Sequence, residues 1–200
     1  MIRSFLLVTL TSAAFNCAVA ADCPNYASDL ATMRVADQSL REYFVDVGPV
    51  SRRLVNALGS IDRVNTRRMR VLLKQCGWPV TSKYGKEASA NAWLLIQHAD
   101  QDREFQREAL LLLGQVVKAG EARGGDLAYL SDRIAVAEGR LQLYGTQFRG
   151  VENCKLVLAP IDSREAVNAR RRAIPGMQTL EEYEKVAGAH ITPPECRHAP

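Results

Sequence analysis

Apolar residues recur every three or four positions along much of the chain, which is the spacing of one face of an α-helix. In the first such stretch the series is Leu30, Met33, Asp37, Leu40 and Phe44, so an acidic residue interrupts an otherwise apolar stripe. Similar spacing and helix boundary signals predict helices over about 26–47, 51–75, 86–99, 103–119 and 127–138. The second of these ends at Gly-Trp-Pro, because glycine suits a left-handed helix cap and proline cannot continue the helix.

The pattern changes after residue 139. Residues 141–148 alternate in polarity and are rich in strand-forming residues, and residues 151–158 can pair with them across a turn at Arg149-Gly150. The sequence therefore predicts a small antiparallel hairpin after the helices.

Helical signals return near the C-terminus. Asp162 or Ser163 can cap a charged helix that runs to about residue 172, and a last short helix is expected over 179–186, before a proline-containing tail. We expect the run Arg170-Arg171-Arg172, like the arginines at 67, 68 and 70, to lie on a solvated helix face. Together these elements predict a mainly α (α+β) protein: a compact multi-helix domain with one small antiparallel β-hairpin.

The N-terminus has the features of a secretory signal peptide. Arg3 precedes a short apolar run, and Ala18-Val19-Ala20 forms a small-residue exit, so cleavage is expected after Ala20. Phe15 fits poorly in a lipid-attachment box ending at Cys17, which favours a chain without a lipid anchor. We expect residues 1–20 to be the signal, residues 21–200 to be a single helical domain with a C-terminal tail, and the mature protein to be periplasmic or secreted without a transmembrane segment.

The net charge and the cysteine content further limit the kind of protein that this chain can be. The formal charge is +4 and falls to +3 when Arg3 is removed with the signal, a mild excess that does not resemble the basic stripe of a nucleic-acid-binding protein. Four cysteines remain after cleavage, and an even number in an exported chain indicates disulfides. An antiparallel pair formed by the first two helices would bring Cys23 beside Cys76, which leaves Cys154 to pair with Cys196. The absence of a Cys-x-x-Cys pair gives no reason to expect a metal site.

A polar block, Gln97 to Asp102, separates two strongly apolar helices. A histidine in the last turn of one helix and an aspartate capping the next would explain these residue types without any chemistry. Alternatively, the imidazole of His98 acts as an acid or base, because imidazole gains and loses a proton near neutral pH. The candidate catalytic residues are then His98, Asp100 and Asp132. The candidate ligand-binding residues are Arg133, Gln142, Tyr144, Thr146 and Gln147.

Several short blocks occur in a characteristic order: Gly77-Trp78-Pro79, Gln97-His98-Ala99-Asp100, a segment from Leu127 to Arg133 that reads LAYLSDR, and Tyr144-Gly145-Thr146-Gln147. In these blocks the chain resembles a bacterial family of unknown function over roughly residues 37–183, with Ser131 where threonine is usual. The resemblance implies that the polar blocks belong together, but it implies no reaction.

Three functional hypotheses follow. The first is an exported protein with a polar ligand-binding or catalytic pocket around His98, with hydrolysis as the most natural reaction in that compartment. The second is a non-catalytic envelope interaction protein or an inhibitor of the immunity type. The third is a buried hydrogen-bond network that only fixes the fold. The expected partner is a polar small molecule or an envelope component and not nucleic acid. The sequence does not identify a cofactor or an oligomeric state, and it does not distinguish an enzyme from a binding protein.

Overall fold

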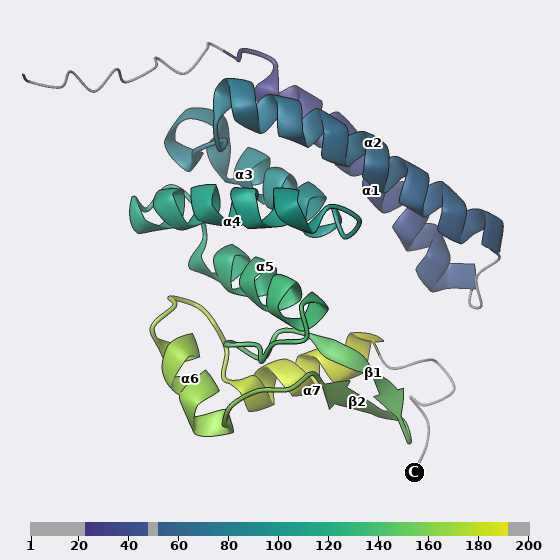
Figure 1. Ribbon diagram of the computed structural model, residues 1–200, viewed down its shortest axis with the longest axis vertical. Helices are drawn as coiled ribbons and strands as arrows, with labels where there is room; N and C mark the ends of the chain where they lie inside the picture. The colour runs from purple at the N-terminus through teal and green to yellow at the C-terminus, as the bar shows by residue number, and fades with distance from the viewer. Residues whose placement is uncertain (1–22, 48–51, 192–200) are drawn as a thin grey trace, which may run out of the picture.

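The structure, a computed structural model, describes residues 23–47 and 52–191 (Figure 1). The predicted signal peptide, its cleavage site, and the tail with Cys196 lie outside the described residues. The described elements, in chain order, are α1 (Tyr26–Val47), α2 (Arg52–Cys76), α3 (Thr81–Gln97), α4 (Arg103–Lys118), α5 (Gly124–Ala137), β1 (Phe148–Glu152), β2 (Lys155–Leu158), α6 (Arg164–Arg172) and α7 (Leu180–Ile191). The expectation of a mainly α protein with one small antiparallel hairpin is confirmed.

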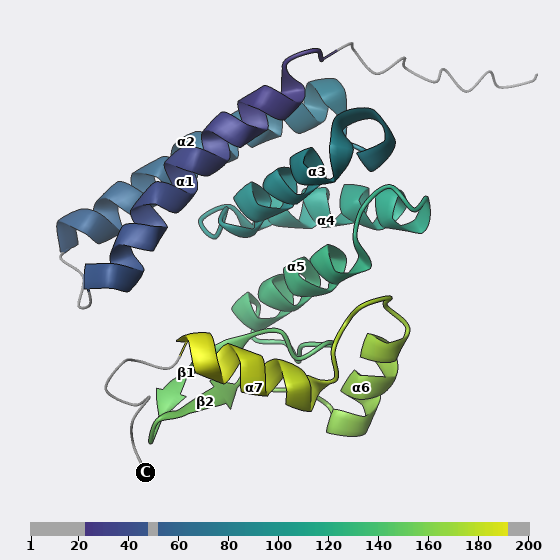
Figure 2. The ribbon, with the colours of Figure 1, turned by 180° about the vertical axis from the view of Figure 1, so that it is seen from behind.

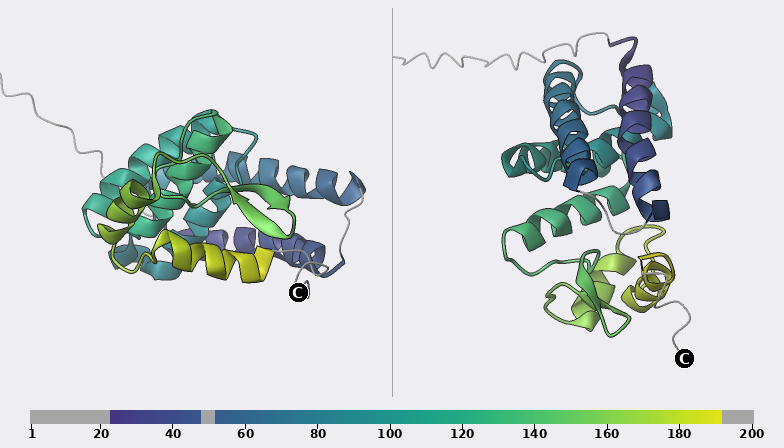
Figure 3. Two further views of the ribbon diagram at one scale, coloured as in Figure 1. Left: turned by 90° about the horizontal axis from the view of Figure 1, so that it is seen from below. Right: turned by 90° about the vertical axis from the view of Figure 1, so that its right-hand side faces the viewer.

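The helices stack in layers from one end of the molecule to the other. α1 and α2 lie side by side at one end, α3 and α4 follow, and α5 separates them from α6, α7 and the hairpin at the other end (Figures 1 and 2). The right-hand view of Figure 3 shows the same order, and α7 packs against strand β2 of the hairpin. A core of side chains such as Leu30, Met69, Leu95 and Leu113 joins the first four helices to α5. Within the described residues, no helix combines the length and apolarity needed to cross a membrane.

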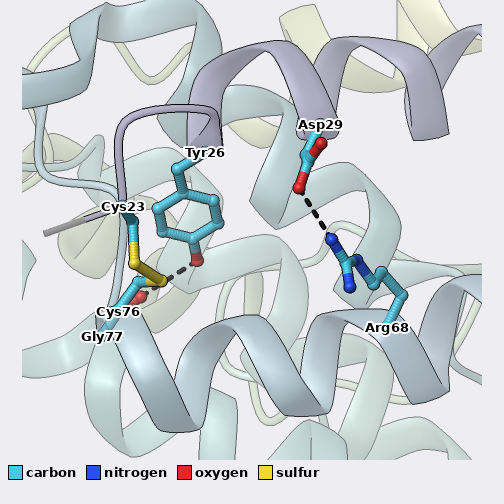
Figure 4. Close-up of a disulfide and its surroundings, with 6 residues drawn as sticks. All are labelled: Cys23, Tyr26, Asp29, Arg68, Cys76 and Gly77. Carbon is cyan, nitrogen blue, oxygen red and sulfur yellow. Dashed lines mark hydrogen bonds and ion pairs between the residues drawn. A yellow bond between two sulfur atoms is a disulfide. The ribbon is translucent and has the colours of Figure 1, made fainter. Parts of the chain in front are cut away.

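A disulfide joins the segment just before α1 to the last residue of α2 (Figure 4). Cys23 and Cys76 are bonded, as predicted from the antiparallel arrangement, with their Cα atoms 6.1 Å apart. The Tyr26 hydroxyl donates a hydrogen bond of 3.0 Å to the carbonyl of Gly77 beside the disulfide. Cys154 is also disulfide-bonded; the predicted pairing with Cys196 falls on a residue outside the described ones.

Local signals explain how α2 ends and α3 begins. Gly77 has a φ of +70°, the left-handed conformation that the Gly-Trp-Pro block predicted. Trp78 is buried, and its indole donates to the Ser89 hydroxyl at 2.9 Å. α3 begins at Thr81, earlier than expected, with a non-helical Gly85 (φ +83°) near the point where the prediction had started it.

The predicted register of the hairpin was wrong. Its strands are Phe148–Glu152 and Lys155–Leu158, and the turn lies at Asn153 and Cys154, not at residues 149–150. These two turn residues have φ values of +48° and +58°, as a two-residue type I′ turn requires. Residues 141–147 do not form a strand because most of their backbone N–H groups bind side chains, as described below.

The expectation that residues 170–172 form a solvated face was wrong for one of the three arginines. Arg171 is only 2% exposed, whereas Arg172 lies on the surface. Val167 is buried four residues earlier in α6, so Arg171 follows it on the inward face of the same helix. The spacing of four residues between Val167 and Arg171 was therefore the sequence signal that Arg171 lies on the buried face of the helix.

Candidate functional site

His98 contacts a buried carboxylate on another helix. Its Nδ1 lies 3.0 Å from Oδ1 and 2.9 Å from Oδ2 of Asp37, which is in the middle of α1. The side chain of Asp37 is 1% exposed and that of His98 is 15% exposed. Since an ionised carboxylate only accepts hydrogen bonds, the imidazole donates through Nδ1–H, and this leaves Nε2 as the other functional atom.

Asp37 is held by more than the imidazole. Gln38 Nε2 donates to its Oδ2 at 2.5 Å, and Arg41 Nε donates to the same oxygen at 3.3 Å. Arg41 also bridges to Asp62 of α2 through Nη2, at 2.5 Å. The result is a chain of alternating charges that joins the middle of α1, the middle of α2 and the end of α3.

These contacts decide the charge of Asp37. Burial by itself would raise the pKa of the carboxyl, but the hydrogen bond and charge of His98, with help from Gln38 and Arg41, bring it below its ordinary value. For Asp62 the balance is opposite, because burial raises its pKa more than Arg41 and His98 lower it. Asp37 is therefore ionised at neutral pH and can stabilise a positive charge on the imidazole.

Sequence reasoning did not assign Asp37 to the site, although the signal was present. A carboxylate at the inward position of the Leu30, Met33, Asp37 series has to be paired, because a buried unpaired charge is strongly unfavourable. The partner, His98, is 61 residues away in the sequence. Only the packing of α1 against α3 identifies it.

Asp100 serves a different contact from the one proposed for it. Its carboxylate binds Arg133 of α5, with Nε at 2.8 Å from Oδ1 and Nη2 at 2.5 Å from Oδ2. Arg103 adds a contact of 3.1 Å to Oδ1. Burial would raise the pKa of Asp100, but the two arginines lower it. This bidentate pair ties the α3–α4 connection to α5.

Asp132 holds the backbone of the segment after α5. Its carboxylate is fully buried and accepts hydrogen bonds from the N–H groups of Leu143, Tyr144 and Thr146, at 2.8 to 3.1 Å, and from the Thr146 hydroxyl at 3.0 Å. Burial raises its pKa, and the four donors oppose that rise. These bonds take the N–H groups that a strand would need, which explains the wrong hairpin register.

Gln142 fixes the same segment from within. Its amide nitrogen donates to the carbonyls of Gln147 and Ala159, at 3.0 and 2.8 Å, and its amide oxygen accepts from the N–H of Gln147 at 2.8 Å. The Gln147 side chain in turn donates to the Thr146 hydroxyl at 3.0 Å. All the donors and acceptors of the Gln142 amide are thus directed at the protein itself, with the backbone of residues 142–147 as the framework.

The predicted site residues therefore fall into separate clusters. His98 is bonded to Asp37, Asp100 is paired with Arg133, and Asp132 is bonded to the loop that contains Tyr144. No hydrogen bond links His98 to Asp100 or to Asp132 among the described residues. The role of orienting the imidazole, expected of one of those two aspartates, falls to Asp37 in this arrangement.

The site offers acid–base groups and no cluster for a metal. In the ranges that the structure describes, no three or more His, Cys, Asp or Glu side chains converge as metal ligands. What the arrangement can do is transfer a proton at His98 Nε2 while Asp37 keeps the ring oriented.

Comparisons with known proteins locate the chain in one family. The family of unknown function DUF6624 matches residues 24–190, which includes every block named above. No match was found among curated proteins or among solved structures.

Proposed function

The chain belongs to the DUF6624 family, whose function is unknown, and we propose that it is an exported protein in which His98 and Asp37 form an acid–base centre for hydrolysis of a polar envelope component. The observation that carries the proposal is the contact of His98 Nδ1 with both oxygens of a fully buried carboxylate. Such a contact fixes the tautomer and the orientation of the ring, which are the two properties that a general base needs.

The proposed chemistry uses the second ring nitrogen, Nε2. In the neutral ring Nε2 carries the lone pair, so it can take a proton from a water molecule as the water oxygen attacks an ester, amide or phosphoester centre. The imidazolium that forms is stabilised by the Asp37 carboxylate, and the same proton then passes from Nε2 to the leaving group. Groups of this kind contribute about 10²- to 10⁴-fold to rate.

An exported location is supported by the cross-link between α1 and α2. A disulfide between two helices is stable in an oxidising compartment and is rare in reducing ones. Together with the signal-like N-terminus, this favours the periplasm or the exterior of the cell, where hydrolysis of envelope material is a natural reaction.

The first experiment tests the geometry. In protein labelled with ¹⁵N-histidine, long-range ¹H–¹⁵N spectra distinguish the two neutral tautomers. We expect His98 to carry its proton on Nδ1 in the wild type and to lose that preference in Asp37→Asn. A neutral His98 with its proton on Nε2 would contradict the proposal.

The second experiment tests the activity. Purified protein is incubated with chromogenic ester and phosphoester substrates and with isolated cell-wall material, and the products are followed by absorbance and mass spectrometry. We expect a hydrolytic activity that His98→Gln reduces by about 10²-fold or more, whereas His190→Gln, which removes another imidazole of the chain, leaves it unchanged. Equal activity of the two variants would exclude His98 as the base.

One observation favours the alternative of a non-catalytic interaction protein. Val64 and Val71 are seven residues apart on α2, so they lie on one face of the helix, and they are 55% and 44% exposed. Exposed apolar residues aligned on a helix can form part of a protein-binding surface. Under this alternative, Val64→Ser with Val71→Ser would abolish a phenotype that His98→Gln leaves intact.

A further inference from the structure

The described part of the molecule contains a cavity whose lining does not include His98. It has a volume of about 730 Å³ and lies between the α4–α5 connection, the start of α5 and the segment after α6. Figures 1 and 2 show the loop after α6 reaching up to the α4–α5 connection. The size is that of a small-molecule site.

The cavity contains a buried positive charge without an acidic partner. Arg171 lines it and is 2% exposed, yet its guanidinium forms no ion pair with any described residue. It donates from Nε to the carbonyl of Gln178 and from Nη1 to the carbonyl of Tyr144, both at 2.6 Å. A guanidinium has five N–H donors, so three remain for another acceptor.

Such a charge is costly to bury. Burial lowers the pKa of Arg171, and the nearby Tyr129 and Tyr183, followed by the carboxylates of Asp132 and Glu181, counter only part of this effect. A guanidinium nevertheless keeps its proton at neutral pH. Proteins normally pair a buried charge, because its loss of hydration is otherwise uncompensated. Two neutral carbonyls accept two of its five N–H groups and do not neutralise its charge.

The rest of the lining has the same electrostatic character. Arg123, whose side chain is 73% exposed, also lines the cavity, and none of the described lining residues is acidic. Gly124 and Gly125 begin α5 there, and no side chain caps this helix N-terminus. The positive end of the helix therefore adds to the two arginines, and the Asp126 carboxylate in the same first turn, 3.9 Å from Arg123, offsets part of that charge.

The remaining walls are apolar and aromatic. Tyr183 lies under the Arg171 guanidinium, with 5.0 Å between the guanidinium carbon and the ring centre, and its ring meets that of Tyr129 edge-on at 5.9 Å. Ile174 and Met177 contribute aliphatic surface from the segment after α6. A ligand that fits these walls has an apolar or aromatic body and an anionic head.

We infer that this cavity binds a small organic oxyanion, a carboxylate or phosphate carried on an aromatic or apolar body, with Arg171 as the main ligand of the anionic group. The ligand supplies the negative charge that the protein lacks at Arg171. This site is separate from the His98 centre and does not depend on the function proposed for it.

Isothermal titration calorimetry tests the inference on the full-length protein with its disulfides intact, at pH 7 and low ionic strength. The probes are phenyl phosphate, benzoate and the neutral analogue phenol. We expect saturable binding of phenyl phosphate, of benzoate, or of both, with phenol at least about tenfold weaker, because charge-assisted hydrogen bonds to the guanidinium are lost. The stronger of the two anions identifies the head group. No saturable binding of either anion, or binding of phenol as tight as that of the anions, would overturn the inference.

Two variants on the same helix assign the charge. Arg171→Gln should weaken binding of the anion about tenfold or more, whereas Arg172→Gln, which removes the same charge from the exposed neighbour, should leave it unchanged. A folded Arg171→Gln protein that binds like the wild type would refute the site.

If Arg171→Gln does not fold, the variant Arg123→Gln is used in its place, since the exposed Arg123 side chain contributes little to the stability of the fold. We then expect about two- to fivefold weaker binding for Arg123→Gln and no change for Arg172→Gln. Equal effects of these two variants would mean general charge attraction and would refute a specific site.

Discussion

Asp126 has a buried carboxyl group with almost nothing to compensate its charge. It lies in the first turn of α5, and its side chain is 4% exposed. The nearest cation is Arg123, whose Nη1 is 3.9 Å from Oδ1 and whose side chain is largely in solvent. No described residue donates a hydrogen bond to the carboxylate. Burial therefore raises the pKa of Asp126 to about 6, and the charge of Arg123 offsets only part of the rise.

This pKa has a definite consequence for stability. The folded protein binds the proton more tightly than the unfolded chain, whose aspartate titrates near 3.8. The free energy of unfolding therefore falls as the pH rises from about 4 to 6 and is constant above that range, as far as this group is concerned. The gap between the two values corresponds to about 3 kcal/mol. The helix dipole favours a negative charge at this end by up to about 1 kcal/mol, so a net cost of about 2–3 kcal/mol remains.

Asp126→Asn measures that cost, because the neutral amide resembles the protonated acid. Urea unfolding followed by circular dichroism, with the disulfides intact, gives the free energy of unfolding of both proteins between pH 4 and 8. We expect a small difference at pH 4 that grows until the variant is about 2–3 kcal/mol more stable at pH 7. Other carboxyl groups are common to the two proteins and cancel in the difference.

Glu165→Gln is the matched control. Glu165 is an acid in the first turn of α6, but it is exposed, so its neutralisation should change stability by no more than about 0.5 kcal/mol. A pH-independent difference between wild type and Asp126→Asn, or a variant less stable than wild type at pH 7, would refute the argument that burial sets the charge of Asp126.

Three further variants test the fold, each by urea unfolding. Asp132→Ala should cost about 3–5 kcal/mol, because it leaves three N–H groups and a hydroxyl, those of Thr146 buried, without their acceptor; a loss below about 1 kcal/mol would mean that water replaces the carboxylate. Replacing Cys23 and Cys76 by serine should cost about 4 kcal/mol, the loop-closure entropy for their separation of 53 residues, and unchanged stability would contradict the cross-link. Gly145→Ala should cost at least about 1 kcal/mol, because φ is +66° and the new Cβ would lie 2.7 Å from Leu180; a neutral result would show that this approach is not tight.

The sequence predicted the helices well because an α-helix is a local structure. Its hydrogen bonds join residues four apart, and its buried face repeats every three or four residues, so both leave a pattern within a short window. The Ser163 cap of α6, whose hydroxyl accepts from the N–H of Ala166, and the left-handed Gly77 were readable for the same reason. The pairing of Cys23 with Cys76 followed from one additional step, the antiparallel return of α2 along α1.

The hairpin register could not be predicted in this way. Residues 141–148 have the alternation of a strand, but three of their N–H groups bind Asp132, which belongs to the preceding helix. A strand pattern states which residues can pair, whereas the competing acceptor is known only when α5 and the segment after it are placed together. The observed turn lies at Asn153 and Cys154, where positive φ values fit the twist of the hairpin.

The chain by itself thus determined the helices and the pairing of Cys23 with Cys76. Tertiary structure alone decided what each polar side chain contacts: Asp37 for His98, the backbone of residues 143–146 for Asp132, and a cavity for Arg171. The physical reason is range. Backbone hydrogen bonds and apolar periodicity act between near neighbours in sequence, but the partner of a buried charge is whatever packing brings within about 3 Å of it, at any distance along the chain.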